Sequence, residues 1–196
     1  MSTNPEKLVI KIGTATLSSL DNAGAINIEI VEKLSNVISN LKKSGHKVVL
    51  VTSGAVALGV KKLSLSKKPK TILEKQISAA IGQPLLMQTY EKYFSKHNIP
   101  IAQIRLTRDG FTQREVYINA RETILELFEM NVLPIINEND VIDLNSFGGN
   151  DYLAAEIATL LSINQVLVLS QMAQSVHGVG GGKIKLQVVD DLNKKG

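Results

Sequence analysis

The sequence contains no cysteine and no tryptophan, and only 4% of its residues are aromatic. Without cysteine the chain cannot form disulfides, zinc–thiolate sites or a thiol nucleophile. Few aromatic side chains are available on which the bases of single-stranded nucleic acid could stack. Its three histidines, His46, His97 and His177, lie far apart, and none pairs at a metal-ligand spacing. We therefore predict no protein-held metal, no thiol catalysis and no nucleic-acid partner.

Long apolar runs are also missing. The longest are of strand length, and the N-terminus lacks the apolar core of a signal peptide. We expect a cytoplasmic protein without a membrane partner. The net charge of +4 comes largely from lysines, many of them between residues 61 and 70. A solvated lysine face explains this excess, and it would also attract anionic small molecules.

Strand-like and helix-like segments alternate along the chain. Apolar runs predict buried strands at 8–12, 48–51, 99–106, 132–136 and 165–169. Helical spacing predicts helices at 28–41, 71–98, 119–130 and 151–162, the second of them broken at residues 82–84. We read 107–117 as a polar segment and 137–150 as an irregular loop. This alternation predicts an α/β fold, a three-layer sandwich with a mainly parallel central sheet, in one domain over residues 1–196.

Small or polar residues follow four of these strands, at 11–14, 52–55, 137–140 and 170–171. Because the carboxyl ends of parallel strands meet at one edge of a sheet, we expect these four segments to converge there. Lys11 ends an otherwise apolar strand, which suits an ammonium that neutralises a transferring phosphoryl group. The alternative for Lys11 is a solvated lysine at a strand end.

The segment at 48–59 is a buried strand that passes through Thr52-Ser53-Gly54 into a helix. Such a turn presents unpaired N–H groups, which favour an anion. The alternative is an ordinary turn in which Ser53 is the helix N-cap.

Two further polar segments have functional and structural interpretations. Asp151, which follows a Gly-Gly-Asn sequence, is either the N-cap of its helix or a carboxylate that orients lysines or magnesium beside a reacting phosphoryl group. Asn137, Asn139 and Asp140 would bind an ammonium or amide of a substrate, or else form Asx turns.

The glycine-rich segment at 178–185 is not a P-loop. Its glycine spacing is one residue short, and Ile184 stands where the motif requires Ser or Thr. It is either a phosphate-covering loop with a lysine or a flexible linker.

Six segments together resemble the glutamate 5-kinases, a branch of the amino acid kinase family. They are Val-Ile-Lys-Ile-Gly-Thr at 9–14, Val-Thr-Ser-Gly-Ala-Val-Ala-Leu-Gly at 51–59, Ala-Ala-Ile-Gly-Gln at 79–83, Asn-Ala-Arg-Glu-Thr at 119–123, Pro-Ile-Ile-Asn-Glu-Asn-Asp at 134–140 and Gly-Asn-Asp-Tyr-Leu-Ala-Ala at 149–155. The match runs from about Lys7 to Leu169.

The resemblance implies ATP- and Mg²⁺-dependent phosphorylation of the side-chain carboxylate of L-glutamate, giving glutamyl 5-phosphate for proline synthesis. By motif match, Lys11 would stabilise the transferring group, Asp151 would orient the catalytic lysines, and Lys185 would be the second such lysine. The implied glutamate-binding residues are Ser53, Gly54, Ala55, Asp140 and Asn150. The implied nucleotide-binding residues are Lys11, Gly13, Ser170, Gln171, Gly180, Gly181 and Lys185. A homo-oligomer (dimer or tetramer) and proline feedback are further expectations.

The chain departs from the family after Leu169. Ser170-Gln171-Met172 stands where the family has Thr-Asp and a longer nucleotide-binding segment, and Gly149 stands where it commonly has an acidic residue. We expect an intact glutamate half, a shortened nucleotide-binding part and no C-terminal accessory domain. The alternative is a non-catalytic relative that binds glutamate or associates with kinase subunits after losing ATP binding.

Overall fold

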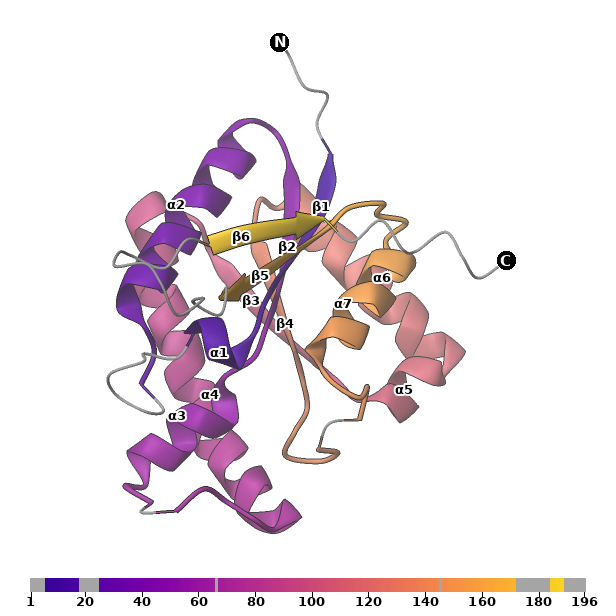
Figure 1. Ribbon diagram of the computed structural model, residues 1–196. Coiled ribbons are helices and arrows are strands. Elements are labelled where there is room, and N and C mark those ends of the chain that lie inside the picture. The colour runs from indigo at the N-terminus through magenta and orange to yellow at the C-terminus, as the bar shows by residue number, and fades with distance from the viewer. Residues whose placement is uncertain (1–5, 18–24, 66, 145, 172–183, 189–196) are drawn as a thin grey trace.

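The computed structural model describes residues 6–17, 25–65, 67–144, 146–171 and 184–188 (Figure 1). For residues 170–171 and 184–188 it describes the backbone alone.

A single sheet forms the middle layer, with strands in the order β3-β4-β2-β1-β5-β6. The strands are β1 Lys7–Ile12, β2 Lys47–Thr52, β3 Ile101–Leu106, β4 Leu133–Glu138, β5 Val166–Gln171 and β6 Ile184–Val188. The first five are parallel to their neighbours, and β6 pairs antiparallel with β5. The predicted, mainly parallel central sheet is confirmed.

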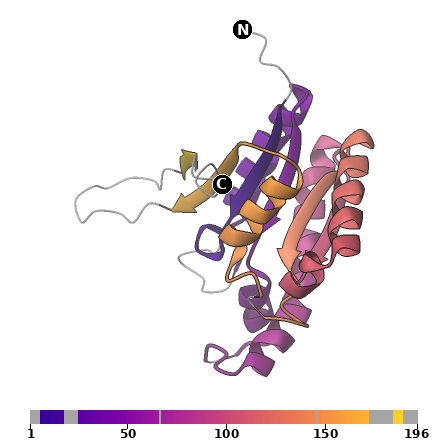
Figure 2. The same ribbon diagram turned by 90° about the vertical axis from the view of Figure 1, so that its right-hand side faces the viewer.

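Helices cover both faces of the sheet, which confirms the three layers (Figure 1). One face carries α2 Ile28–Lys43, α3 Ala55–Lys62 and α4 Ile72–Phe94, near the short α1 Thr14–Leu17 and the 3-10 turn Ser95–His97. The other carries α5 Arg108–Thr112, α6 Arg114–Glu129 and α7 Asn150–Leu160. Figure 2 looks onto this second face and shows α7 over the middle of the sheet and α6 toward β3 and β4.

The sheet is buried from both sides because alternate strand residues face opposite helical layers. Val49 and Val51 of β2 belong to the core beneath α6 and α7. Val48 and Leu50 belong to the core beneath α2 and α4. All four side chains are fully buried, which explains why the sequence shows a continuous apolar run there instead of alternation.

The predicted break in the helix at residues 82–84 is wrong. The helix α4 begins with a capping box of Thr71 and Glu74 and runs without interruption through Pro84 to Phe94. Pro84 is exposed, so the loss of one backbone N–H is tolerated at the solvent side. Gly82 is needed for close approach instead, because a Cβ there would overlap the carbonyl oxygen of Ala55.

Two other boundaries differ from the sequence prediction. The segment 107–117, expected to be a polar segment, contains α5 and the start of α6, with the Thr107 side chain accepting a hydrogen bond from the Gly110 N–H. Asn137 and Glu138, expected in a loop, are the last residues of β4, where they pair with Arg105 and Leu106 of β3. Backbone pairing with β3 decides the conformation of these two polar residues.

Candidate active site

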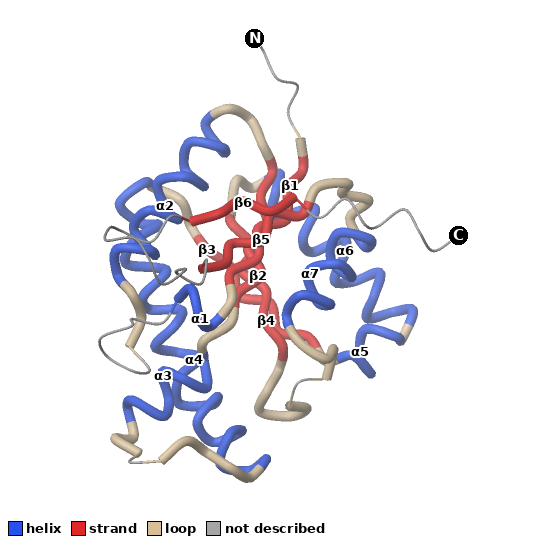
Figure 3. Tube along the Cα trace, in the orientation of Figure 1, coloured by secondary structure: helices blue, strands red, loops and turns tan. Residues whose placement is uncertain are grey.

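The ends of β1, β2, β4 and β5 lie side by side, so the predicted convergence of their polar segments is confirmed. Figure 3 shows the loops at this end of the sheet, beside α3 and α4. A cavity of about 750 Å³ opens there. All five predicted glutamate-binding residues line it, namely Ser53, Gly54, Ala55, Asp140 and Asn150.

The turn after β2 has a left-handed residue at its centre. Gly54 has φ of 107° and is the N-cap of α3, with no side-chain cap. Most side chains would be strained in that conformation, so glycine is required. The alternative interpretation of Ser53 as the N-cap is therefore wrong. Its hydroxyl oxygen accepts a hydrogen bond from the Asn150 side chain at 2.6 Å.

The Asn150 side chain ties α7 to two strand ends. Its amide nitrogen lies 2.9 Å from the carbonyl oxygen of Thr52 and 3.2 Å from Oδ1 of Asn137, in addition to the Ser53 hydroxyl. Its own Oδ1 is buried and has no partner among the described residues. A buried acceptor without a donor favours a ligand that brings an N–H group.

Lys11 and Asp151 form an ion pair across the end of β1, with Nζ 2.8 Å from Oδ1. The Lys11 side chain is only 11% exposed, whereas that of Asp151 is 70% exposed. Lys11 is thus not the solvated lysine of the alternative interpretation. Asp151 is not an N-cap either, because Gly149 occupies that position and Asp151 lies in the first turn of α7.

Gly13 leaves room for the Lys11 ammonium. A Cβ on Gly13 would lie 3.2 Å from Lys11 Nζ, which is closer than most side-chain contacts. The ammonium therefore sits against bare backbone at the end of β1. This arrangement fits a phosphate group, which can approach the backbone and the ammonium together.

The predicted nucleotide-binding residues of the later chain are only partly described. Ser170 and Gln171 end β5, beside the end of β1. Lys185 lies on β6 and pairs with Ser170 of β5. Lys185 thus belongs to a strand, whereas we had placed it in the glycine-rich loop. Gly180 and Gly181 lie outside the described residues.

Two buried polar residues of α4, to which the sequence analysis assigns no role, form hydrogen bonds to the strand ends. Gln83 of α4 accepts a hydrogen bond from the Asn137 side chain at 3.0 Å. The Tyr90 hydroxyl lies 2.6 Å from the Thr52 hydroxyl, and burial raises the pKa of Tyr90 well above its ordinary value. Both residues lie on the inward face of α4, where helical spacing indicates only core packing.

Glu138 is a further residue that we did not assign a role. It is 3% exposed, lines the cavity, and accepts a hydrogen bond from the Phe147 N–H at 3.3 Å. Burial raises the pKa of Glu138, and the charge of Asp140 adds to this effect, while hydrogen bonds from backbone N–H groups oppose it. Glu138 and Asp140 thus place two carboxyl groups at one wall of the cavity.

The raised pKa of Glu138 predicts a pH-dependent stability difference for Glu138→Gln. Above the ordinary value of 4.5 and below the raised value, the folded wild type binds more protons than the unfolded chain. Its free energy of unfolding therefore falls as pH rises through that window, and the variant lacks this fall. Urea denaturation across pH 4 to 8 should show Glu138→Gln gaining stability relative to wild type with rising pH. Exposed Glu126→Gln is the control, and a pH-independent difference for Glu138→Gln would contradict the account.

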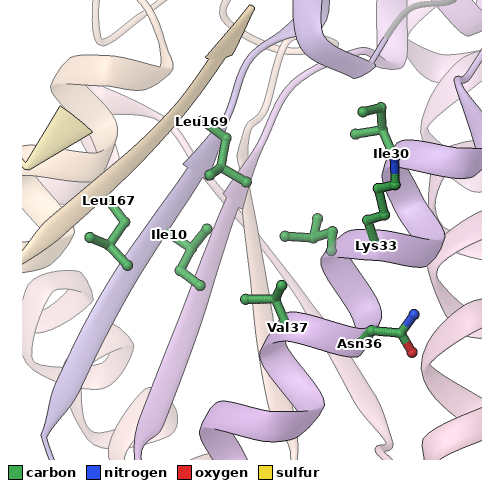
Figure 4. Close-up of a pocket in the computed structure, with 8 residues that line it drawn as sticks. Ile10, Ile30, Lys33, Asn36, Val37, Leu167 and Leu169 are labelled. Atoms are coloured by element: carbon green, nitrogen blue, oxygen red, sulfur yellow. The ribbon is translucent and has the colours of Figure 1, made fainter. Parts of the chain in front are cut away.

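A second cavity, of about 400 Å³, lies between α2 and the sheet (Figure 4). Figure 4 shows Ile10, Leu167 and Leu169 of the strands facing Ile30 and Val37 of α2. The one charged side chain that lines it, Lys33, is paired with Glu29 on its own helix. The described residues that line this apolar cavity include no group suited to acid–base or phosphoryl chemistry.

Two other features are absent from the described residues. No helix there is long and apolar enough to cross a membrane. Within the same ranges, no three His, Cys, Asp or Glu side chains form a group that could hold a metal ion.

Residues 6–179 match the amino acid kinase family. The chain is 45% identical to a glutamate 5-kinase of Thermoanaerobacter sp. (strain X514) over 168 residues, which cover 85% of this chain and 45% of that enzyme. It is 36% identical to the glutamate 5-kinase of Clostridium acetobutylicum over 98% of this chain and 73% of that enzyme. The chain thus spans about half the length of the Thermoanaerobacter relative.

Among solved structures, the UMP kinase of Ureaplasma parvum has a similar fold, with a TM-score of 0.58. It is 16% identical and the match covers 89% of this chain and 73% of that one. At this identity the likeness concerns the fold alone.

Proposed function

Because the chain belongs to the amino acid kinase family, we propose that it catalyses ATP-dependent phosphorylation of the side-chain carboxylate of L-glutamate. The product is glutamyl 5-phosphate, the first intermediate of proline synthesis. The observation that carries this proposal is the cavity at the strand ends, where the five predicted acceptor residues lie beside the Lys11–Asp151 pair. The curated relatives bear the name glutamate 5-kinase.

The cavity offers groups complementary to the α-carboxylate and the ammonium of glutamate. At the turn after β2, the Ser53 hydroxyl and the backbone N–H groups of Gly54 and Ala55 suit a carboxylate. In the same cavity, the Asp140 carboxylate and the buried Oδ1 of Asn150, whose amide nitrogen bonds to Ser53, suit an ammonium. Glutamate bound in this direction would present its side-chain carboxylate to the end of β1.

Lys11 is placed to stabilise the transfer. A side-chain carboxylate oxygen of glutamate forms the bond to phosphorus while the bond from phosphorus to the leaving oxygen of ADP breaks. Negative charge then spreads over the transferring group, and a fixed ammonium stabilises it. Asp151 holds Nζ of Lys11 at 2.8 Å, so that the charge is in position before the reaction.

The nucleotide would lie beyond the ends of β1 and β5, where Gly13 offers bare backbone and Ser170 and Gln171 end their strand. We propose that Lys185, Gly180 and Gly181 complete this side. Mg²⁺ bound to the nucleotide phosphates would supply further positive charge. Because the described residues hold no group of three His, Cys, Asp or Glu side chains that could bind a metal ion, an ion that arrives with the nucleotide fits the site better than one held by the protein alone. Homo-oligomer assembly, proline feedback and a cytoplasmic location are proposals that the family alone supports.

Isothermal titration calorimetry tests the proposal through its two ligands. We expect saturable binding of L-glutamate and, separately, of ATP with Mg²⁺. The controls are D-glutamate, in which the ammonium is misplaced, and glutarate, which lacks it. Both should bind at least about tenfold more weakly than L-glutamate. Glutamate binding without nucleotide binding would favour the non-catalytic relative, and absence of glutamate binding would contradict the proposed acceptor site.

A further inference from the structure

The segment that carries Asp140 continues directly from the pairing of β3 with β4. Arg105 of β3 is opposite Asn137, and the next residue, Leu106, is opposite Glu138. One step further, the Asn139 N–H donates to the Leu106 carbonyl oxygen at 2.8 Å. The end of β3 therefore fixes the backbone that leads into Asp140.

The Arg105 side chain lies on the α4 side of this pair of strands. Residues opposite one another on adjacent parallel strands point to the same face of a sheet, and Asn137 points to Gln83 of α4. Arg105 thus points to the face of the sheet that α4 covers, as Asn137 does.

Two donors of the Arg105 guanidinium are unpaired. Nε and Nη2 are buried and have no hydrogen-bond partner among the described residues. Together these two atoms form one edge of the guanidinium, whose spacing matches the two oxygens of a carboxylate. A buried donor edge without a partner is unfavourable, and it needs a reason other than packing.

Among the described residues, Asp140 of the cavity is the charged group that acts on Arg105. Burial lowers the pKa of Arg105 from its ordinary value, and the charge of Asp140 opposes that shift. Asp140 also repels Glu138, and the cavity is lined in addition by Lys67, Lys68 and Lys75. Arg105 is therefore a cation that interacts with Asp140, and Asp140 in turn shares one wall of the cavity with Glu138.

We propose that Arg105 is a positioning residue of the acceptor site, which orients the Asp140 carboxylate at the cavity wall and offsets its repulsion with Glu138. The inference rests on the proposed function, in that the group to be received there is the ammonium of glutamate. When both carboxyl groups are ionised, the side chains of Arg105, Glu138 and Asp140 together carry one net negative charge. This charge complements a single ammonium. Without Arg105, ionisation of both carboxyl groups is unfavourable, and the ammonium loses its partner.

Binding measurements on matched variants test this role. We expect Arg105→Leu to weaken L-glutamate binding about tenfold by calorimetry, because the positive charge that acts on Asp140 is lost. Arg105→Lys keeps the charge but not the planar edge, and should fall between Arg105→Leu and wild type. The control is Arg114→Leu, which removes an exposed guanidinium at the start of α6 and should change binding less than about twofold. Thermal denaturation shows whether each variant is folded.

A double variant distinguishes positioning from packing. If Arg105 acts through Asp140, then adding Arg105→Leu to Asp140→Asn should weaken glutamate binding by less than about twofold further. Full additivity of the two substitutions would overturn the inference.

A measurement without ligand keeps this inference separate from the proposed function. In the unliganded protein, NMR titration of the side-chain carboxyl carbons of Glu138 and Asp140 should show higher midpoints in Arg105→Leu than in wild type. Arg105→Lys should restore most of the difference. Unchanged midpoints would overturn the inference even if glutamate binds, whereas raised midpoints in a protein that binds no glutamate would contradict only the proposed function.

Discussion

Replacement of Lys11 by alanine is expected to lower the turnover of glutamyl phosphate formation by about two orders of magnitude or more. The Lys11 side chain is 11% exposed, and its ammonium lies against Gly13 and is held by Asp151, so the charge is fixed where charge develops during transfer. Water that fills the vacated space would have to reorient during the reaction. The lower activity of Lys11→Ala should therefore appear as a lower kcat.

The same substitution should largely spare folding. Asp151 is 70% exposed, so it can be solvated once Lys11 is gone, and such pairs contribute about 1 kcal/mol or less to stability. Lys7→Ala is the matched control, because Lys7 begins the same strand and is exposed. An unchanged rate in folded Lys11→Ala would remove Lys11 from the mechanism.

Gly82→Ala is expected to destabilise the fold by about 3 kcal/mol. A Cβ on Gly82 would overlap the carbonyl oxygen of Ala55 and approach the backbone nitrogen of Gly59 to 2.6 Å. Both neighbours are backbone atoms, so no side chain can rotate away and α3 must shift as a unit. Alanine favours helix over glycine by about 1 kcal/mol, which is too little to compensate.

Urea denaturation measures this effect, and exposed Gln88→Ala on the same helix is the control, expected within about 0.5 kcal/mol of wild type. Since Ala55 lines the cavity, surviving Gly82→Ala protein should also bind glutamate more weakly. Wild-type stability in Gly82→Ala would show that the two helices do not cross as closely as described.

The layers of the fold could be predicted from local patterns of apolar residues in the sequence. Val48 to Val51 are uniformly apolar because both faces of β2 are covered, and that pattern is sufficient to predict a buried parallel strand. Pro84 misled the same reasoning, since a proline normally ends a helix. Only the crossing of α3 and α4 shows why Gly82 is present inside a continuous helix.

Some residues of the candidate site were likewise predictable from the sequence, and others were not. Lys11, Ser53 and Asp151 were identified because they follow predicted strands or precede a predicted helix. The structure places Lys11 beside Asp151 and Ser53 beside Asn150. Gln83 and Arg105 gave no such signal, because helical spacing assigns Gln83 to core packing, and a polar residue such as Arg105 on an edge strand looks solvent-exposed until its partners are known. Gln83 bonds to Asn137, which lies 54 positions further along the chain. Arg105 lies on β3 and is paired with the end of the neighbouring strand β4, from which the segment with Asp140 follows.

The central claim, that the cavity at the strand ends receives glutamate for phosphoryl transfer, is tested most directly by trapping the product. The protein is incubated with L-glutamate, ATP and Mg²⁺ in the presence of hydroxylamine, which converts an acyl phosphate into a coloured hydroxamate. The account predicts γ-glutamyl hydroxamate whose formation requires both substrates and falls by about two orders of magnitude or more in Lys11→Ala. Hydroxamate formation that does not depend on glutamate, or none from folded protein that binds both substrates, would contradict it.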